Sequence, residues 1–89
     1  MARARRGDLD AYEHLVAGHS ALAIRTAALL GAGDDAEDVV QEAFVKAFGR
    51  LRLYRGESGF RPWLLAIVAN EARNLQRSRR RREALAVRV

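Results

Sequence analysis

Four side chains able to contact nucleic acid recur at helical spacing in the C-terminal half of this 89-residue chain. They are Trp63, Asn70, Arg73 and Arg77, separated by seven, three and four residues, so a helix would place them on one side. Arginines can neutralise phosphates, an asparagine amide can bond a base edge at two points, and a tryptophan ring can stack on a base. The pattern therefore indicates a surface that contacts nucleic acid.

Further aromatic residues lie close to this set in the sequence. Tyr54 offers a ring beside Trp63, and Phe60 offers a third ring if it is not buried. Aromatic rings beside arginines suit single-stranded or flipped bases, because a base that has left the duplex needs a stacking partner. The arrangement therefore favours opened strands. The alternative for Trp63 is a half-buried core tryptophan, and the two interpretations are compatible.

The sequence holds no pattern typical of catalysis. There are no cysteines, and His14 and His19 cannot form a metal site alone, so we interpret them as surface or boundary residues. The segment RGESG is glycine-rich but follows neither the Walker nor the dinucleotide-binding spacing. The chain is therefore expected to be no enzyme and to use no metal or cofactor.

Charge divides the chain into two halves. Residues 1–49 hold five basic and eight acidic side chains, whereas residues 50–89 hold eleven basic and three acidic ones. All the basic residues except Lys46 are arginines, the usual choice for phosphate recognition. The split predicts a polyanion as partner of the C-terminal half and a different partner for the N-terminal half. The alternative is a solvated charge run without a partner.

The elements that position these residues are all expected to be helices. A basic arm (residues 1–7) precedes Asp8, a good N-cap, and the apolar period that follows predicts a helical unit over residues 9–30. Gly18 and Ser20 interrupt it, so we expect one kinked helix or two helices end to end. Gly31 to Gly33 should end the unit.

The next helix is expected over residues 36–50, with Asp35 and Asp38 resembling a capping box. Its apolar stripe is Val40, Ala43, Phe44, Ala47, Phe48 and Leu51. On the other side, a set that we call the acidic ridge recurs at helical spacing; it comprises Asp38, Gln41, Glu42 and Val45. An exposed acidic face can serve solubility alone, and the pattern by itself favours that interpretation.

The last helix is expected to begin within residues 58–62, with Pro62 in its first turn. Its core stripe is Leu64, Ile67, Val68, Ala72 and Leu75. Arg79 to Arg82 extend this helix or fray from it, and residues 83–89 are the start of a linker or a tail. The result is one all-α domain over residues 8–82, a compact bundle of three main helices. The first of these helices is either continuous and kinked or split into two. No apolar run approaches the ~18 residues of a membrane span, so no membrane is expected.

Two strings resemble a known family. DAEDVVQEAF (residues 35–44) and FRPWLLAIVAN (residues 60–70) resemble region 2 of sigma-70 in extracytoplasmic-function sigma factors, and GDLDAYEHLV (residues 7–16) resembles its opening helix. The two strings at this separation are specific, and the resemblance covers about residues 7–82. Leu65 and Ala66 stand where many relatives carry an aromatic or basic residue. The second helical domain usual in such factors, which reads the −35 element, does not lie within these 89 residues, so we expect either an excised domain or an unusual member of the family.

The resemblance implies the promoter-melting domain of a bacterial transcription initiation factor that works with core RNA polymerase in the cytoplasm. The acidic ridge would bind the clamp coiled coil of the largest polymerase subunit, in place of the solubility role. The loop from Tyr54 to Gly59 would form, with Asn70, a pocket for a base flipped from the non-template strand of the −10 element. An anti-sigma factor would be a further partner. The implied DNA-binding residues are Tyr54, Arg55, Gly56, Glu57, Ser58, Phe60, Arg61, Trp63, Asn70, Arg73, Asn74 and Arg77.

Two alternatives remain open on the residues. An arginine-rich helical nucleic-acid-binding protein would explain the basic half of the chain but not the acidic ridge. A sigma-like module that binds only proteins would explain the acidic ridge and leave the basic face without a role.

Overall fold

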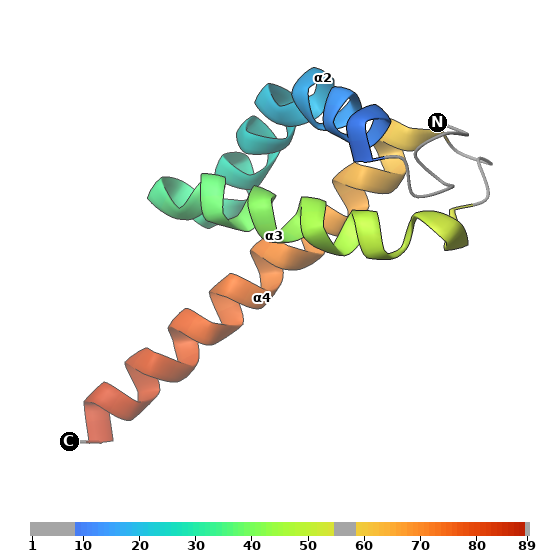
Figure 1. The fold of residues 1–89 in the computed structure, drawn as a ribbon. Helices are drawn as coiled ribbons and strands as arrows, with labels where there is room; N and C mark the ends of the chain where they lie inside the picture. The colour runs from blue at the N-terminus through green and yellow to red at the C-terminus, as the bar shows by residue number, and fades with distance from the viewer. Residues whose placement is uncertain (1–8, 55–58, 89) are drawn as a thin grey trace.

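The computed structural model describes residues 9–54 and 59–88, with the side chains of Arg52 and Arg88 excepted. Within these ranges the chain is all-α and forms no strand, as predicted. Three α-helices, α2 (Leu9–Ala27), α3 (Ala36–Gly49) and α4 (Phe60–Arg88), account for most of it (Figure 1). A π-helical turn (Ala28–Ala32) and a 3-10 turn (Gly33–Asp35) join α2 to α3, and a second 3-10 turn (Leu51–Leu53) follows α3.

The first helical unit is a single helix, so the expectation of two helices end to end is wrong. α2 is helical through Gly18 and Ser20, and Ser20 caps no second segment. A glycine inside a helix costs about 1 kcal/mol, but α2 buries Tyr12, Ala23 and Ala27 against the other helices. Tertiary packing of this kind stabilises a helix more than local propensity does.

The turn between α2 and α3 depends on two glycines. Gly31 has a φ of 97° and Gly33 a φ of 56°, values that only glycine adopts readily, so the predicted stop is confirmed. The capping box is wrong: Asp35 precedes α3, but its side chain makes no capping hydrogen bond. Its carboxylate instead pairs with Arg79 of α4, because the turn lies against that helix.

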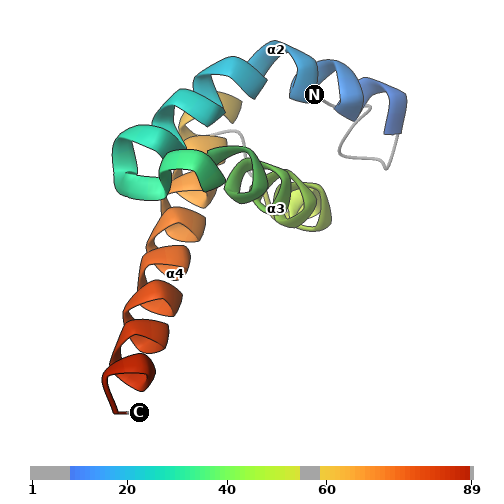
Figure 2. The same ribbon diagram turned by 90° about the vertical axis from the view of Figure 1, so that its left-hand side faces the viewer.

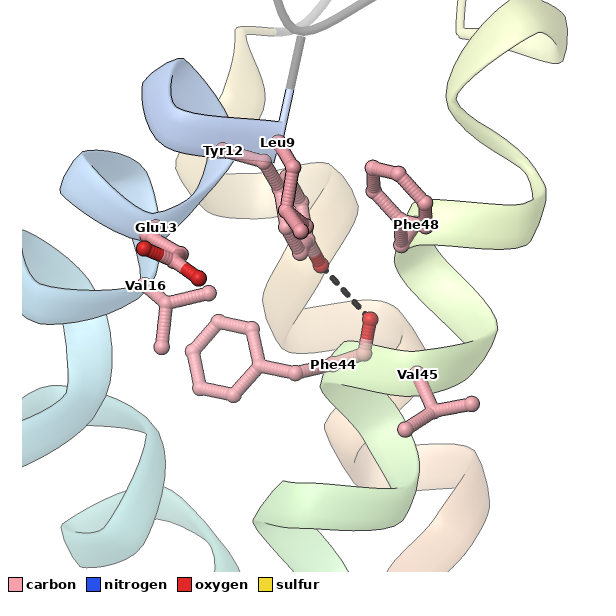
Figure 3. A pocket seen from close by; sticks show the side chains of 7 residues that line it. All are labelled: Leu9, Tyr12, Glu13, Val16, Phe44, Val45 and Phe48. Atoms are coloured by element: carbon pink, nitrogen blue, oxygen red, sulfur yellow. Dashed lines mark hydrogen bonds between the residues drawn. The ribbon is translucent and has the colours of Figure 1, made fainter. Parts of the chain in front are cut away.

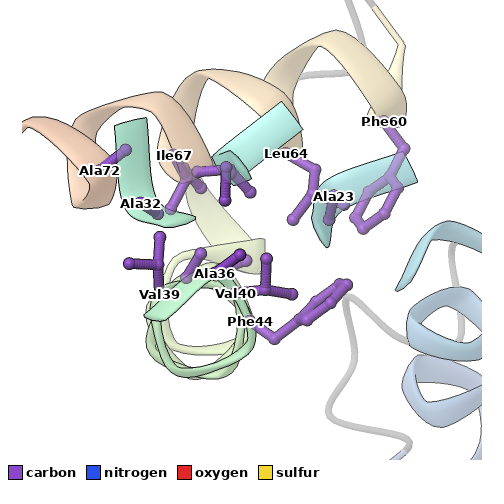
Figure 4. Close-up of a cluster of buried hydrophobic side chains, with 14 of the residues drawn as sticks. Ala23, Ala32, Ala36, Val39, Val40, Phe44, Phe60, Leu64, Ile67 and Ala72 are labelled. Carbon is purple, nitrogen blue, oxygen red and sulfur yellow. The ribbon is translucent and has the colours of Figure 1, made fainter. Parts of the chain in front are cut away.

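The core lies where the three helices meet (Figure 4). α3 contributes six buried residues to it, beginning with Ala36, and α4 contributes Leu64, Ile67, Val68 and Ala72. Many core residues are alanines, which lets the helix backbones approach closely. The buried residues of α3 after Ala36 are Val39, Val40, Ala43, Phe44 and Ala47. Phe48, predicted for the core stripe, is 36% exposed, and Leu75 is only partly buried against the core.

Helix α4 is longer than the predicted domain. It begins at Phe60 with Pro62 in its first turn, as expected, and continues beyond Arg82 to Arg88. Residues 80–87 are exposed, and Figures 1 and 2 show this end of α4 running away from the other helices. Residues 83–88 are therefore helical, and their role as the start of a linker or a tail stays a prediction.

The segment from Leu9 to Gly49 is more apolar than expected from its broken apolar runs. Leu9–Gly49 contains an 18-residue window with a mean hydropathy of 1.4, enough by length and composition alone to cross a membrane. The expectation that no segment approaches this limit is therefore wrong by that measure. The same segment, however, turns at Gly31 and Gly33 and supplies the buried Ala23 and Ala27, so the observation is weak evidence for a span.

Candidate nucleic-acid and protein interfaces

The acidic ridge is a solvent-exposed edge of α3. All four of its residues are exposed, and Val45 exposes 67% of its surface. They remain exposed because the opposite side of α3 is buried against α2 and α4. The predicted exposure is thus confirmed, while the binding role of the acidic ridge stays a prediction.

An apolar groove lies beside the acidic ridge, between α2 and α3 (Figure 3). It has a volume of about 330 Å³, and Glu13 is the charged residue in its lining. The other lining residues are Leu9, Tyr12, Val16, Phe44, Val45 and Phe48. Val45 belongs to both features, so the acidic ridge continues directly into an apolar surface. The groove was not predicted, because the helical period places Phe48 in the core stripe.

Tyr12 closes the floor of this groove. Its hydroxyl donates a hydrogen bond of 2.6 Å to the backbone oxygen of Phe44, and its ring lies 4.8 Å from that of Phe48, centroid to centroid. Burial raises the pKa of Tyr12 to about 12, because an apolar surrounding disfavours the phenolate. Tyr12 therefore fixes α2 to α3 as a neutral hydrogen-bond donor.

Four rings from three parts of the chain form an aromatic cluster at the start of α4. Tyr54 and Phe60 lie 5.1 and 5.9 Å from the ring of Trp63, and His19 lies 5.1 Å from Phe60. Tyr54 and Phe60 are buried, at 7% and 8% exposed, so the expectation that Tyr54 offers an open ring is wrong. Trp63 is half-buried, and His14 and His19 lie at the surface and the boundary as predicted.

The remaining candidate DNA contacts lie on α4 or outside the described residues. Arg61, Arg73 and Arg77 are exposed, whereas Asn70 and Asn74 are half-buried. Asn70 lies two turns beyond Trp63, roughly 10 Å along the helix. The structure thus keeps these side chains together on one helix. The predicted loop residues Arg55, Gly56, Glu57 and Ser58 lie outside the described residues.

Arg79 differs from the arginines around it. Its Nη1 donates to the oxygen of Gly31 at 3.0 Å, and its Nη2 to the oxygen of Ala32 at 3.1 Å. Nη2 also lies 2.5 Å from the Asp35 carboxylate. Arg79 belongs to the basic half of the chain, for which the charge predicts a polyanionic partner, but its guanidinium is bonded to the α2–α3 turn. No sequence pattern distinguishes Arg79 from its neighbours, because it is the first of four consecutive arginines.

A second ion pair joins α3 to α4. Lys46 Nζ lies 2.5 Å from Glu71 Oε1, and Glu71 is only 7% exposed. Neither residue belongs to a pattern that predicts a role from the sequence. Among residues 9–54 and 59–88, no group of three or more metal-ligating side chains lies close enough together to hold a metal ion.

These features define a class of protein. Residues 15–82 match the sequence model of sigma-70 region 2, and the chain belongs to that family. It is 36% identical over 74 residues to the ECF RNA polymerase sigma-E factor of Escherichia coli K12, which is 83% of this chain and 39% of that protein. The chain is 35% identical over 82 residues to the ECF RNA polymerase sigma-E factor of Haemophilus influenzae Rd, which is 92% of this chain and 43% of that protein.

The namesake factor of Salmonella typhimurium LT2 is 35% identical over 74 residues, which is 83% of this chain and 39% of that protein. The chain therefore spans about two fifths of the length of the curated relatives it matches. The predicted resemblance to region 2 of extracytoplasmic-function sigma factors is confirmed.

Proposed function

We propose that this chain is the region 2 module of a bacterial transcription initiation factor that binds core RNA polymerase and opens the promoter −10 element. The observation that carries the proposal is the family match over residues 15–82, which includes both the acidic ridge and the α4 residues. The proposed role is that of a binding protein in the bacterial cytoplasm, without catalysis of its own.

The acidic ridge is the proposed contact for the clamp coiled coil of the largest polymerase subunit. Its exposed carboxylates and amide offer charged and hydrogen-bonding groups, while Val45 and the apolar groove offer a surface that gains free energy when covered. Charged groups at such an edge set the specificity and the rate of association more than the affinity. An anti-sigma factor is a further proposed partner of the module.

The start of α4 is the proposed site of base capture. Trp63, held by the buried rings of Tyr54 and Phe60, would stack on a base flipped from the non-template strand, and the amide of Asn70 would hydrogen-bond its edge. Residues 55–58, between Tyr54 and Gly59, would complete the pocket. Unstacking a base costs a few kcal/mol, which stacking, hydrogen bonding and polymerase contacts would offset without nucleotide hydrolysis.

The arginines on α4 are the proposed phosphate contacts. Arg73 and Arg77 are exposed and form no ion pair with the described residues, so their guanidinium groups are available to the backbone of the strand. Arg61 lies one residue after Phe60 and would contact the same strand near the pocket. The basic half of the chain thus acquires the polyanionic partner that its charge predicts.

Two binding measurements test the proposal. The chain is titrated with the isolated clamp coiled coil and, separately, with single-stranded −10 DNA and a scrambled strand. Clamp binding together with a preference for −10 DNA in the polymerase complex is expected. DNA binding without sequence preference and without clamp binding would instead indicate a general nucleic-acid-binding protein, and clamp binding without −10 preference a protein-interaction module.

A further inference from the structure

Two ion pairs join the α3 region to α4, and we call them the interhelix pairs. One links Asp35, directly before α3, to Arg79, and the other links Lys46 near the end of α3 to Glu71. The order is reversed along the two segments: the earlier residue of one pairs with the later residue of the other. We propose that the interhelix pairs are positioning devices, which hold the acidic ridge and the DNA-facing part of α4 in one fixed arrangement.

The charges of the interhelix pairs specify both direction and register. If α4 lay along α3 in the opposite direction, Asp35 would meet Glu71 and Lys46 would meet Arg79, and like charges repel. A shift of α4 by one turn would place Ile67 or Leu75 opposite Lys46, leaving its ammonium group without a partner. Only the observed arrangement pairs all four charges, whereas apolar packing among alanines and valines discriminates less between registers.

The positions of the interhelix pairs relative to the proposed interfaces support this role. The acidic ridge spans residues 38–45, which lie between Asp35 and Lys46. On α4, Arg73, Asn74 and Arg77 lie between Glu71 and Arg79, and Asn70 directly precedes Glu71. The acidic ridge and the proposed phosphate contacts of α4 are therefore each flanked at both ends by an ion pair to the other segment, while the proposed base-capture residues Trp63 and Asn70 precede Glu71.

The Arg79 pair also holds the turn that precedes α3. Arg79 donates to the oxygens of Gly31 and Ala32, and the amide of Gln76 donates to the oxygen of Leu30 at 2.7 Å. These carbonyls follow the end of α2, where helical partners are lacking. The guanidinium of Arg79 is consequently engaged by the protein, unlike that of the exposed Arg77, and Arg79 is a positioning residue rather than a phosphate contact.

This inference rests on the proposed function, but its first test does not. Amide hydrogen exchange is measured on the whole chain for wild type, Arg79→Gln and the matched control Arg80→Gln, which removes an exposed charge from the next position of α4. We expect at least tenfold faster exchange over residues 31–36 in Arg79→Gln and no change in the control. Equal exchange in all three proteins would overturn the positioning role.

The second test separates positioning from phosphate contact. The affinity for single-stranded DNA is measured against salt concentration for Arg79→Gln and for Arg77→Gln. Loss of one phosphate contact lowers the magnitude of the slope of log affinity against log salt concentration by about one. We expect this decrease for Arg77→Gln only. A comparable decrease in Arg79→Gln would show that Arg79 contacts phosphate and would contradict the inference.

The third test uses the polymerase complex on a promoter with a fluorescent base in the −10 element. Arg79→Gln and Lys46→Met are expected to open it about tenfold more slowly, with separate affinities for the clamp and for DNA within twofold of wild type. Arg79→Lys keeps the charge pair with Asp35 and should recover part of the rate; it also replaces Arg79→Gln if circular dichroism shows that variant unfolded. Unchanged opening overturns the inference, whereas a wild-type chain that fails to bind the clamp overturns the proposed function alone.

Discussion

Asn70 is the residue on which the base-capture proposal depends most directly. Replacing it with alanine removes an amide that would bond a base edge, so Asn70→Ala should weaken promoter opening by about 1–3 kcal/mol. The measurement is fluorescence of a base analogue in the −10 element with polymerase and the variant chain. Ser78→Ala, an exposed position on the same helix, is the control. If Asn70→Ala opens the promoter as wild type does, Asn70 is not part of the pocket.

The burial of Tyr12 leads to a prediction about the stability of the chain alone, without polymerase or DNA. Its pKa is about 12 in the folded protein against about 10 in the unfolded chain, so the folded state keeps the proton over a range where the unfolded state loses it. The stability that depends on neutral Tyr12 is therefore fully present below pH 10 and is lost as pH rises towards 12. Two pKa units correspond to at most about 2–3 kcal/mol.

The check for Tyr12 is urea unfolding at pH 8 to 12 for wild type and Tyr12→Phe. The phenylalanine variant lacks the hydrogen bond to Phe44 and should be less stable at pH 8 by about 1 kcal/mol. Its stability should then fall less than that of wild type between pH 10 and 12. Parallel curves for the two proteins would show that the buried hydroxyl is not what titrates.

At the scale of the elements, the sequence predicted where the helices lie but not how they join. Helical periodicity located α3 and the core stripe of α4, and Gly31 correctly marked a stop, because these signals are local. The role of Asp35 could not be predicted from its neighbours in the sequence, since its ion-pair partner Arg79 is 44 residues away. Tyr54 was likewise interpreted as an open ring, whereas its burial depends on where Phe60 and Trp63 pack in the folded domain.

Helix α2 provides a prediction at this scale. Because it is continuous and Gly18 has open space around the position of a Cβ atom, Gly18→Ala should raise the free energy of unfolding by about 0.5–1 kcal/mol. Gly31→Ala should do the opposite, since its φ is +97° and a Cβ there would lie 2.1 Å from Gln76 Nε2. Thermal unfolding followed by circular dichroism measures both. A loss of stability in Gly18→Ala would indicate a break in α2.

On the scale of the whole molecule, the two proposed partner surfaces lie on adjacent helices of one small domain. The acidic ridge belongs to α3, the proposed DNA contacts belong mostly to α4, and the interhelix pairs connect the two. The sequence indicated both surfaces through the uneven charge of its two halves. It could not indicate the groove beside Val45, because that surface forms only when α2 and α3 pack with Leu9 and Phe48 at their edges.

Two variants should separate these surfaces. Glu42→Ala removes an exposed carboxylate from the acidic ridge, and Arg77→Ala removes an exposed guanidinium from α4; neither side chain forms an ion pair with the described residues, so both variants should fold as wild type does. Glu42→Ala should weaken clamp binding by about 1 kcal/mol or more while leaving the affinity for single-stranded DNA unchanged. Arg77→Ala should leave clamp binding unchanged and weaken DNA binding, with a smaller dependence on salt.

The same two single variants also test whether the surfaces act in sequence on one complex. If, as proposed, the domain docks on polymerase before it holds an opened strand, Glu42→Ala should reduce promoter opening at low polymerase concentration and lose its effect when polymerase is saturating. Arg77→Ala should reduce opening at every concentration, since its contact is made after docking. Titration of polymerase in the fluorescence assay distinguishes these cases. A defect of Glu42→Ala that persists at saturation would place Glu42 in the opening step itself, and the acidic ridge would then be more than a docking surface.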